Sequence, residues 1–355
     1  MNEIQIGRLS IGPSHPPFIV AELSGNHQHS LERALKLVQM AKNAGAHAIK
    51  LQTYTPDTIT LDIKEGEFLI EDQESLWKNR TLYELYREAH LPWEWHQPIF
   101  EYCRQLGIEA FSTPFDETAV DFLEELQVPC YKIGSPEIVD HDLIRKVAQT
   151  GKPLILSTAA STLGEIGEAV AVARQAGCHQ LILLKCTASY PAQPRDAHLR
   201  TLPHLAESFD ALVGLSDHTL GIGVAIASVA LGACLIEKHF TLSRQEGEVD
   251  SAFSMEPQEF QMLVEESQKA WEALGHIHYL PLHAERVTYS HRPSLYFVED
   301  LFEGTIVLPQ HVRTVRPGKG LPPKELSHIL GLVLTQTVKK GTPVSWDVFK
   351  AHDAD

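Results

Sequence analysis

The sequence contains little cysteine, and none of it occurs in closely spaced pairs. The 355 residues include only five cysteines, most of them within apolar segments: Cys103, Cys130, Cys178, Cys186 and Cys234. Disulfide-stabilised secreted proteins and cysteine-based zinc modules have paired cysteines at short spacing. We therefore expect these residues to be small buried apolar side chains. Cys186 should point away from its polar neighbours Lys185 and Thr187, because side chains alternate along a strand.

Long apolar runs and an excess of basic residues are also missing. No run approaches the roughly 20 apolar residues that a membrane-spanning helix needs, and the first residues lack a basic segment followed by an apolar one. The net charge is −16, from 46 acidic and 30 basic side chains. This excess of acid argues against nucleic acid or an anionic membrane as the main partner. We expect a cytoplasmic protein that holds any anionic substrate with a local basic cluster.

Short apolar runs alternate with amphipathic helical patterns over the first 240 residues. The helical pattern is clearest at 30–44 and 162–176, each preceded or begun by a capping hydroxyl and followed by glycine. Eight strand–helix units in about 250 residues predict a (β/α)8 TIM barrel. A doubly wound open sheet is the alternative, and it requires two strands to be misassigned. The eight strands begin near Phe18, His47, Glu109, Cys130, Pro153, Leu181, Leu212 and Leu235.

The chain outside these units predicts a second domain. The segment 53–92 is too long for an ordinary connection and is expected to cross the barrel mouth as a lid, with a short helix at 82–89. The catalytic barrel is assigned to 1–275, with a closing helix at 256–274. An irregular linker, 276–292, then leads to a small β-rich domain, 293–355, which we expect to dock on its own barrel or a partner's. Its short strands are expected at 294–298, 305–308, 312–315 and 343–344.

Two histidines each end a short apolar run, and the two runs are consecutive strands of the predicted barrel. Parallel strands end at one edge of a sheet, so His218 and His239 should emerge side by side there, with Asp217 and Glu237 adjacent. Imidazole is a common metal ligand, and this placement indicates a metal site. The alternative is two unrelated histidines, one capping a helix and the other paired in the core.

Polar side chains gather at the carboxyl ends of the other predicted strands, where a barrel directs them into one cavity. Burying a lysine is costly unless an anion compensates its charge, so Lys50 and Lys132 indicate a bound phosphate or carboxylate. The alternative is that they form structural ion pairs with Glu22 and Glu137. The set comprises Glu22, Lys50, Gln52, Ser112, Thr113, Lys132, Ser135, Glu137, Ser157, Thr158, Lys185, Thr187, Ser216, His218, Glu237 and His239.

At these residues the chain resembles the sialic acid synthase family and, within it, the pseudaminic acid synthases. The resemblance extends over almost the whole chain and rests on the combination of motifs rather than on any single one. The matching segments are AELSGNH at 21–27, KLQTYT at 50–55, FSTPF at 111–115, YKIGS at 131–135 followed by Glu137, KCTASY at 185–190, GLSDHT at 214–219, EKHF at 237–240, VDSAF at 249–253 and VRPG at 315–318.

The resemblance implies condensation of phosphoenolpyruvate with an N-acylated amino sugar to give a nonulosonic acid and phosphate. It implies that His218 and His239 hold a divalent metal, Mn2+ or Mg2+, and that Glu137 is the acid/base, with Glu22 and Glu237 as rivals. Arg316 of an antifreeze-like (SAF) domain would reach the other subunit's site in a domain-swapped homodimer. Phosphoenolpyruvate would lie among Lys50, Lys132, Thr113, Ser135, Ser157 and Ser216, and the sugar among Glu22, Gln52, Tyr190 and Asp250.

Several alternatives stay open at this point. The same chemistry on another amino sugar would make an N-acetylneuraminate or legionaminate synthase. Two hypotheses come from other functional classes. One is a non-catalytic sugar-binding barrel, and the other is an aldolase that forms a Schiff base on Lys132 or Lys185. The segment beside the phosphate also departs from the family pattern, because Ala159 and Ala160 replace the common Gly-Met. Alanine tolerates positive φ poorly, so this loop could differ in geometry.

Overall fold

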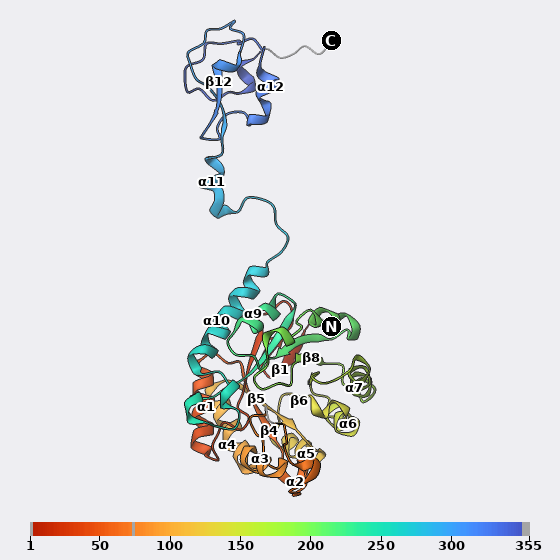
Figure 1. The fold of residues 1–355 in the computed structure, drawn as a ribbon. Helices are drawn as coiled ribbons and strands as arrows, with labels where there is room; N and C mark the ends of the chain where they lie inside the picture. Colours follow the sequence, from red (N-terminus) through yellow and green to blue (C-terminus); the bar gives the residue numbers. More distant parts are fainter. Residues whose placement is uncertain (1–2, 73–74, 350–355) are drawn as a thin grey trace. The chain divides into compact units, whose positions relative to one another are not determined.

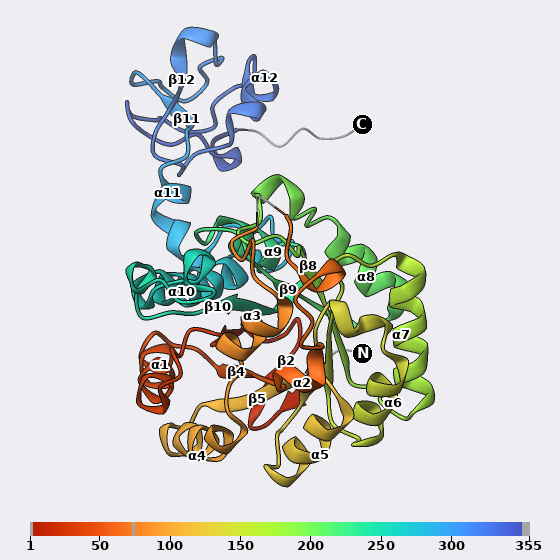
Figure 2. The same cartoon turned by 60° about the horizontal axis from the view of Figure 1, so that its bottom comes forward.

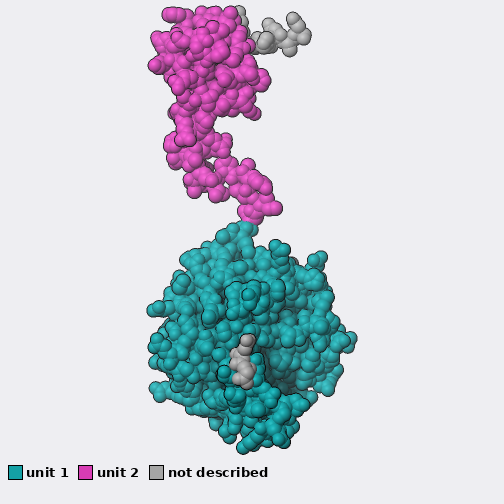
Figure 3. Space-filling model, in the orientation of Figure 1, with its two compact units in different colours: residues 1–275 teal, residues 276–355 magenta. Residues whose placement is uncertain are grey.

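The chain forms two compact units, Met1–Gly275 and His276–Asp355 (Figures 1 and 3). The structure is a computed structural model and describes residues 3–72 and 75–349. The last six residues of the predicted β-rich domain therefore lie outside the described residues. The first unit contains the barrel, and the second contains both the predicted linker and the β-rich domain.

Eight parallel strands close into a barrel, which confirms the predicted TIM fold. The last strand pairs with the first, and this closure sets Leu235 beside Phe18 and His239 beside Glu22. An open doubly wound sheet has no such pairing, so that alternative is wrong. The strands are β3 (Phe18–Glu22), β4 (Ala48–Thr53), β5 (Glu109–Pro114), β6 (Tyr131–Ile133), β7 (Leu154–Ser157), β8 (Leu181–Cys186), β9 (Leu212–Ser216) and β10 (Ala233–His239).

Helices surround the strands on the outside of the barrel (Figure 2). Ser30 and Thr162 cap α1 and α7 through their hydroxyl groups, as their positions in the sequence predict. No helix in the described part of the chain is long and apolar enough to cross a membrane. The helices of this unit are α1 (Leu31–Asn43), α2 (Pro56–Ile59), α3 (Leu82–Ala89), α4 (His96–Leu106), α5 (Glu117–Glu125), α6 (His141–Gln149), α7 (Leu163–Gln175), α8 (Thr201–Phe209), α9 (Gly223–Val229) and α10 (Pro257–Leu274).

The structure contains a small amino-terminal hairpin that the sequence patterns do not predict. Strands β1 (Ile4–Ile6) and β2 (Leu9–Ile11) pair antiparallel. Their buried isoleucines belong to one apolar cluster with Phe18, at the start of β3, and with Phe111 and other inward residues of the strands. The hairpin therefore packs against the amino-terminal end of the barrel, and the open end is the one where the strands finish.

The second unit has fewer strands than the sequence predicts. Within residues 276–349, only β11 (Ser294–Phe297) and β12 (Val312–Val315) form a ladder. The expected strands at 305–308 and 343–344 are reduced to isolated bridges, Ile306 with Val333 and Tyr296 with Pro343. Prolines and glycines interrupt these segments and prevent longer ladders. The predicted linker is partly helical, with α11 (Arg286–Ser290), and α12 (Leu326–Ile329) follows later in the unit.

Candidate active site

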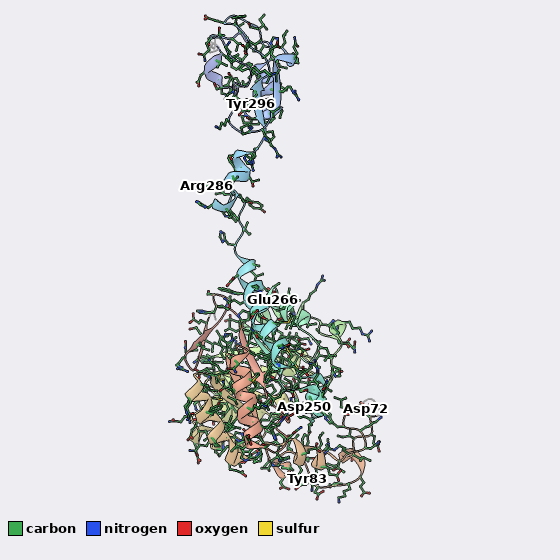
Figure 4. All side chains as sticks on the ribbon, turned by 90° about the vertical axis from the view of Figure 1, so that its left-hand side faces the viewer. Asp72, Tyr83, Asp250, Glu266, Arg286 and Tyr296 are labelled. Atoms are coloured by element: carbon green, nitrogen blue, oxygen red, sulfur yellow. The ribbon has the colours of Figure 1, made fainter. Side chains whose placement is uncertain are left out.

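A cavity of about 440 Å³ lies at the carboxyl ends of the barrel strands. The segment between β4 and α4, here called the excursion (residues 54–92), covers part of it. Asp72 and Tyr83 of the excursion lie on the same side of unit 1 as Asp250 (Figure 4). The predicted site residues that line the cavity are Lys50, Gln52, Thr113, Lys132, Ser135, Glu137, Ser157, Tyr190, Ser216, His218, Glu237, His239 and Asp250.

Three charged side chains, Lys50, Lys132 and Glu237, form the floor of this cavity, and Glu22 is buried against Lys50. Lys50 pairs with Glu22 and, at 3.5 Å, with Glu237, while Lys132 lies 3.8 Å from Glu237. The predicted structural pairing of Lys50 with Glu22 is thus present. The partner of Lys132, however, is Glu237 and not Glu137. Glu22 is completely buried and does not line the cavity, so it supports Lys50 from beneath.

Lys132 is the buried lysine of the floor whose positive charge is least neutralised by nearby carboxylates. Its one carboxylate neighbour within ion-pair distance, among the described residues, is at 3.8 Å. Burial, only partly opposed by Glu237, lowers the pKa of Lys132 below its ordinary value. A buried ammonium is stabilised by an anion, so a phosphate or carboxylate ligand would satisfy it.

Hydroxyl groups stand around the two lysines. Lys50 donates to Thr113 Oγ1 at 3.3 Å, and Ser216 donates to Glu237 Oε1 at 3.2 Å. Ser135 accepts from the Ala159 amide at 3.0 Å, and Ser157 Oγ has no hydrogen-bond partner among the described residues. Buried polar atoms in proteins are almost always hydrogen-bonded. The unpaired Ser157 hydroxyl therefore indicates a ligand at this position.

Glu137 is suited to proton transfer near neutral pH. It follows β6 in a 3-10 turn, Pro136–Val139, that directs it to the cavity. Burial raises the pKa of Glu137 to about 7, against smaller opposing effects that include Lys132. Its Oε2 atom is buried and has no hydrogen-bond partner in the described chain. A carboxyl group with a pKa near the working pH can both give and take a proton.

The two imidazoles lie together, as the sequence predicts. The ring centroids of His218 and His239 are 5.2 Å apart. His218 Nδ1 is 2.9 Å from the Thr187 carbonyl, so Nδ1–H donates there and Nε2 stays available. His239 Nδ1 is buried without a hydrogen-bond partner in the described residues, 3.8 Å from Asp250 Oδ2. Burial, together with His218, holds the pKa of His239 well below its ordinary value, which keeps the ring neutral.

This pair fits a divalent cation only in part. A metal ion binds the neutral imidazole, with the other ring nitrogen held by a hydrogen bond. His239 is held neutral but its Nδ1 has no such partner among the described residues, whereas His218 is anchored by the Thr187 carbonyl but its pKa is raised despite burial, mainly by Cys186. No group of three or more histidine, cysteine, aspartate or glutamate side chains within 3–72 and 75–349 is close enough to enclose an ion. The protein can therefore offer His218 and His239, and water or substrate would complete the coordination.

Lys238 fixes the segment that holds His218. It lies between two cavity residues on β10 and points the other way, because side chains alternate along a strand. Its Nζ donates to Asp217 Oδ2 at 3.0 Å and to the carbonyls of Thr219 and Gly221. Asp217 is thus turned away from the cavity, and its expected place beside the imidazoles is wrong. The same alternation explains this, because Asp217 is the residue between Ser216 and His218.

Alternation also corrects the prediction for Lys185. It lines a separate depression with Thr158 and His204 outside the barrel cavity, and its Nζ donates to the Cys186 carbonyl at 2.7 Å. Ser112 and Thr187 likewise do not line the cavity. Cys186 does line it, with Sγ 3.9 Å from His218 Nδ1, so it is buried as expected but has a polar neighbour.

Ser24 is a cavity residue that sequence reasoning missed. It lies beyond the end of β3 in a left-handed turn, with φ 43°. Its hydroxyl donates to Asp250 and accepts from Gln52 Nε2 at 3.1 Å. Ser24 therefore connects two predicted sugar-binding residues. Non-glycine residues in this conformation are uncommon outside functional sites and tight turns, and no pattern in the sequence distinguishes them.

Arg316 belongs to the second unit, directly after β12. Its contact with substrate stays a prediction. In the loop beside Ser157, Ala160 has φ 51°, a conformation that alanine tolerates poorly, whereas Ala159 has no positive φ; a difference from the family's loop geometry stays a prediction.

Comparison with known proteins agrees with this arrangement. The NeuB family matches residues 37–279, and the SAF domain matches residues 292–350. Pseudaminic acid synthase of Helicobacter pylori is 42% identical over 334 residues, which are 94% of this chain and 97% of that protein. N,N'-diacetyllegionaminic acid synthase of Legionella pneumophila is 35% identical over 346 residues, 96% of each.

A solved structure is similar to most of this chain. The N-acetylneuraminic acid synthetase of Leptospira borgpetersenii, crystallised with citrate, has a TM-score of 0.71 and 32% identity, and the match covers 81% of this chain and 95% of that one. The barrel, the SAF domain and the relatives lead to one conclusion: the chain belongs to the NeuB family and is a C–C bond-forming synthase.

Proposed function

We propose that the protein condenses phosphoenolpyruvate with 2,4-diacetamido-2,4,6-trideoxy-L-altrose to give pseudaminic acid and inorganic phosphate. The main support is the gathering of Lys50, Lys132, Glu137, His218 and His239 around one cavity. The choice of sugar is supported by the identity of 42% to a pseudaminic acid synthase, against 35% to a legionaminic acid synthase. The same cavity with another amino sugar would make N-acetylneuraminate or legionaminate.

Phosphoenolpyruvate is assigned to the lysine side of the cavity. Lys132 has one distant carboxylate partner and would gain most from an anion. The unpaired hydroxyl of Ser157, with Ser135 and Thr113 nearby, would donate to the remaining phosphate or carboxylate oxygens. This placement leaves the histidine side for the aldehyde of the open-chain sugar.

The reaction then needs one new C–C bond and one C–O cleavage. Carbon 3 of phosphoenolpyruvate attacks the aldehyde carbon, and the aldehyde oxygen takes the electron pair and then a proton from Glu137. Carbon 2 becomes positively charged, and water oriented by the Glu237 carboxylate adds there and returns one proton to Glu137. The carbon 2–oxygen bond to phosphate then breaks as the new hydroxyl becomes the keto oxygen; its proton leaves on the phosphate, and the lysines stabilise the departing hydrogen phosphate dianion.

His218 and His239 would hold Mn2+ or Mg2+. When bound, such an ion supplies Lewis-acid stabilisation of the negative charge that develops on the aldehyde oxygen. Asp250 lies 3.8 Å from His239 and accepts a hydrogen bond from Ser24, so it can orient a water molecule or a sugar hydroxyl at this place.

We also propose that two copies of the chain form the working enzyme. The linker exposes a run of large apolar side chains, with Ile277 88%, Tyr279 95% and Leu280 74% exposed. Contiguous apolar surface of this kind is typical of an interaction site. A second copy that covers the linker would bring Arg316 of one subunit to the cavity of the other.

The first prediction concerns turnover. Incubation with phosphoenolpyruvate, Mn2+ and a panel of amino sugars should release phosphate fastest with the diacetamido-trideoxy sugar, and mass spectrometry of the product should identify pseudaminic acid. Absence of phosphate release with every sugar would refute the proposed function.

The second candidate function is that of an aldolase, favoured by the lowered pKa of Lys132. Borohydride with pyruvate would trap its Schiff base as a stable adduct, which the condensation does not form.

A second prediction concerns the metal. His218→Ala and His239→Ala should each remove Mn2+ binding measured by calorimetry, together with Mn2+-dependent turnover, because each deletes one of two imidazole ligands. His204→Ala is the matched control, since His204 lies in the depression outside the cavity. Mn2+ affinity equal to wild type in either cavity variant would contradict the ligand assignment.

The third prediction is a pH dependence of stability caused by Glu137. Its pKa is raised from 4.5 to about 7 in the folded protein. The folded state therefore binds the proton more tightly, and this stabilisation is present below pH 4.5 and lost as pH rises through 7. Glu137→Gln removes this dependence. As pH rises from 5 to 8, the free energy of unfolding of the variant should therefore increase by about 2–3 kcal/mol relative to that of wild type.

Urea unfolding at both pH values measures this difference. Glu207→Gln, on the exposed surface of α8, is the control and should show no such gain. A stability difference for Glu137→Gln that does not change with pH would show that the carboxyl group is ionised throughout.

The fourth prediction tests the exchange of SAF domains between subunits. Arg316→Ala and His239→Ala should each be inactive alone. Co-expressed, they should regain about a quarter of wild-type turnover, because half of the dimers are mixed and each mixed dimer has one intact site. Arg313→Ala, on the exposed side of β12, should stay active. A lack of recovery in the mixed sample would favour a site completed within one chain.

A further inference from the structure

The excursion presents an apolar surface to the cavity although its sequence is rich in charge. Between residues 54 and 89, aspartate, glutamate, lysine and arginine recur throughout. None of these charged side chains lines the cavity in the described part of the excursion. The side chains that do line it, besides Tyr54, are called the apolar wall here: Ile70, Trp77, Leu82, Leu85, Tyr86 and Ala89.

Helix α3 provides most of the apolar wall. Leu82, Leu85, Tyr86 and Ala89 recur at helical spacing and so share one face. Thr81 caps this helix in a reciprocal pair with Glu84, which fixes where it starts. An amphipathic helix normally packs its apolar face on a core. Here that face borders the ligand cavity, and only Leu85 is fully buried.

Trp77 continues the wall toward the imidazoles. Its indole N–H donates to the Val249 carbonyl at 3.1 Å, so it is not available to a sugar hydroxyl. Its ring centroid lies 5.7 Å from that of Tyr190, and the Tyr190 ring lies 4.6 Å from His218. The indole therefore offers an aromatic face close to the place assigned to the aldehyde.

We propose that the apolar wall is the specificity-determining surface for the sugar and that it selects a methyl group over a hydroxymethyl group. This inference rests on the proposed function. The charged groups that line the cavity come from the barrel and none from the described part of the excursion, so the barrel side suits phosphoenolpyruvate and the aldehyde. The sugar's remaining substituents would meet the wall, where a methyl group gains by leaving water and a hydroxyl has the Tyr86 phenol as its one polar partner among the wall side chains, since the Trp77 N–H is already paired.

Leucine 82 offers a direct test. It is the first residue of α3 and only partly buried, so a polar side chain of similar size there should leave the fold intact. Leu82→Asn should accept a hydroxyl that wild type rejects. The measurement is kcat/KM for the 6-deoxy diacetamido sugar and for its 6-hydroxy counterpart. The ratio of the first value to the second should fall about 10-fold or more. This lies within the range of discrimination that one methylene-sized group gives in an apolar pocket.

Controls separate specificity from general damage. Leu76→Asn changes an exposed residue of the same excursion that does not line the cavity, and Leu82→Val keeps an apolar side chain; both should retain the wild-type ratio. The KM for phosphoenolpyruvate should stay the same in all variants. Equal losses with both sugars, or an unchanged ratio, would overturn this inference while leaving the proposed function intact. No turnover of any sugar by wild type would refute both.

Discussion

Closure of the barrel is the constraint on which the site depends. The pairing of β10 with β3 sets His239 beside Glu22, and the pairing of β10 with β9 sets Glu237 beside Ser216. Without this ring of hydrogen bonds, residues more than 200 positions apart would have no reason to meet. Gly214 allows β9 and β10 to approach closely, because a Cβ there would lie 2.4 Å from the Leu235 carbonyl oxygen.

The closed ring brings like and unlike charges together in a space shielded from water. Two lysines and two carboxylates on and beneath the floor nearly cancel, which makes their burial tolerable. The remaining groups are unequally satisfied: Ser157 Oγ, Glu137 Oε2 and His239 Nδ1 have no hydrogen-bond partner among the described residues. A site of this kind is stable enough to fold and still has polar atoms for substrates.

Much of the fold and the floor of the site could be predicted from the sequence. An apolar run that ends in Lys50, Ser157 or His239 predicts a strand, and the polar residue identifies the carboxyl end of that strand, which borders the cavity. The errors concern the direction in which side chains point. Lys185 and Asp217 are each one position away from a cavity residue, and a strand made up almost entirely of apolar residues does not show which of them face the inside of the barrel. Ser24 was missed because a turn has no period, and the apolar wall was missed because the spacing of helix 82–89 predicts an apolar face but does not show that this face borders the cavity. The contact of Arg316 with a cavity stays a prediction, because it depends on the position of the second unit, which periodicity does not give.

The alternation along β10 has a further consequence. Glu237 and His239 face the cavity, while Lys238 holds the neighbouring segment through Asp217. Inserting or deleting one residue in this strand would reverse all three, exposing the ammonium to the ligands and turning the imidazole into the packed layer of helices. The residues of this strand that line the cavity and the residue that fixes the neighbouring segment therefore depend on the same register.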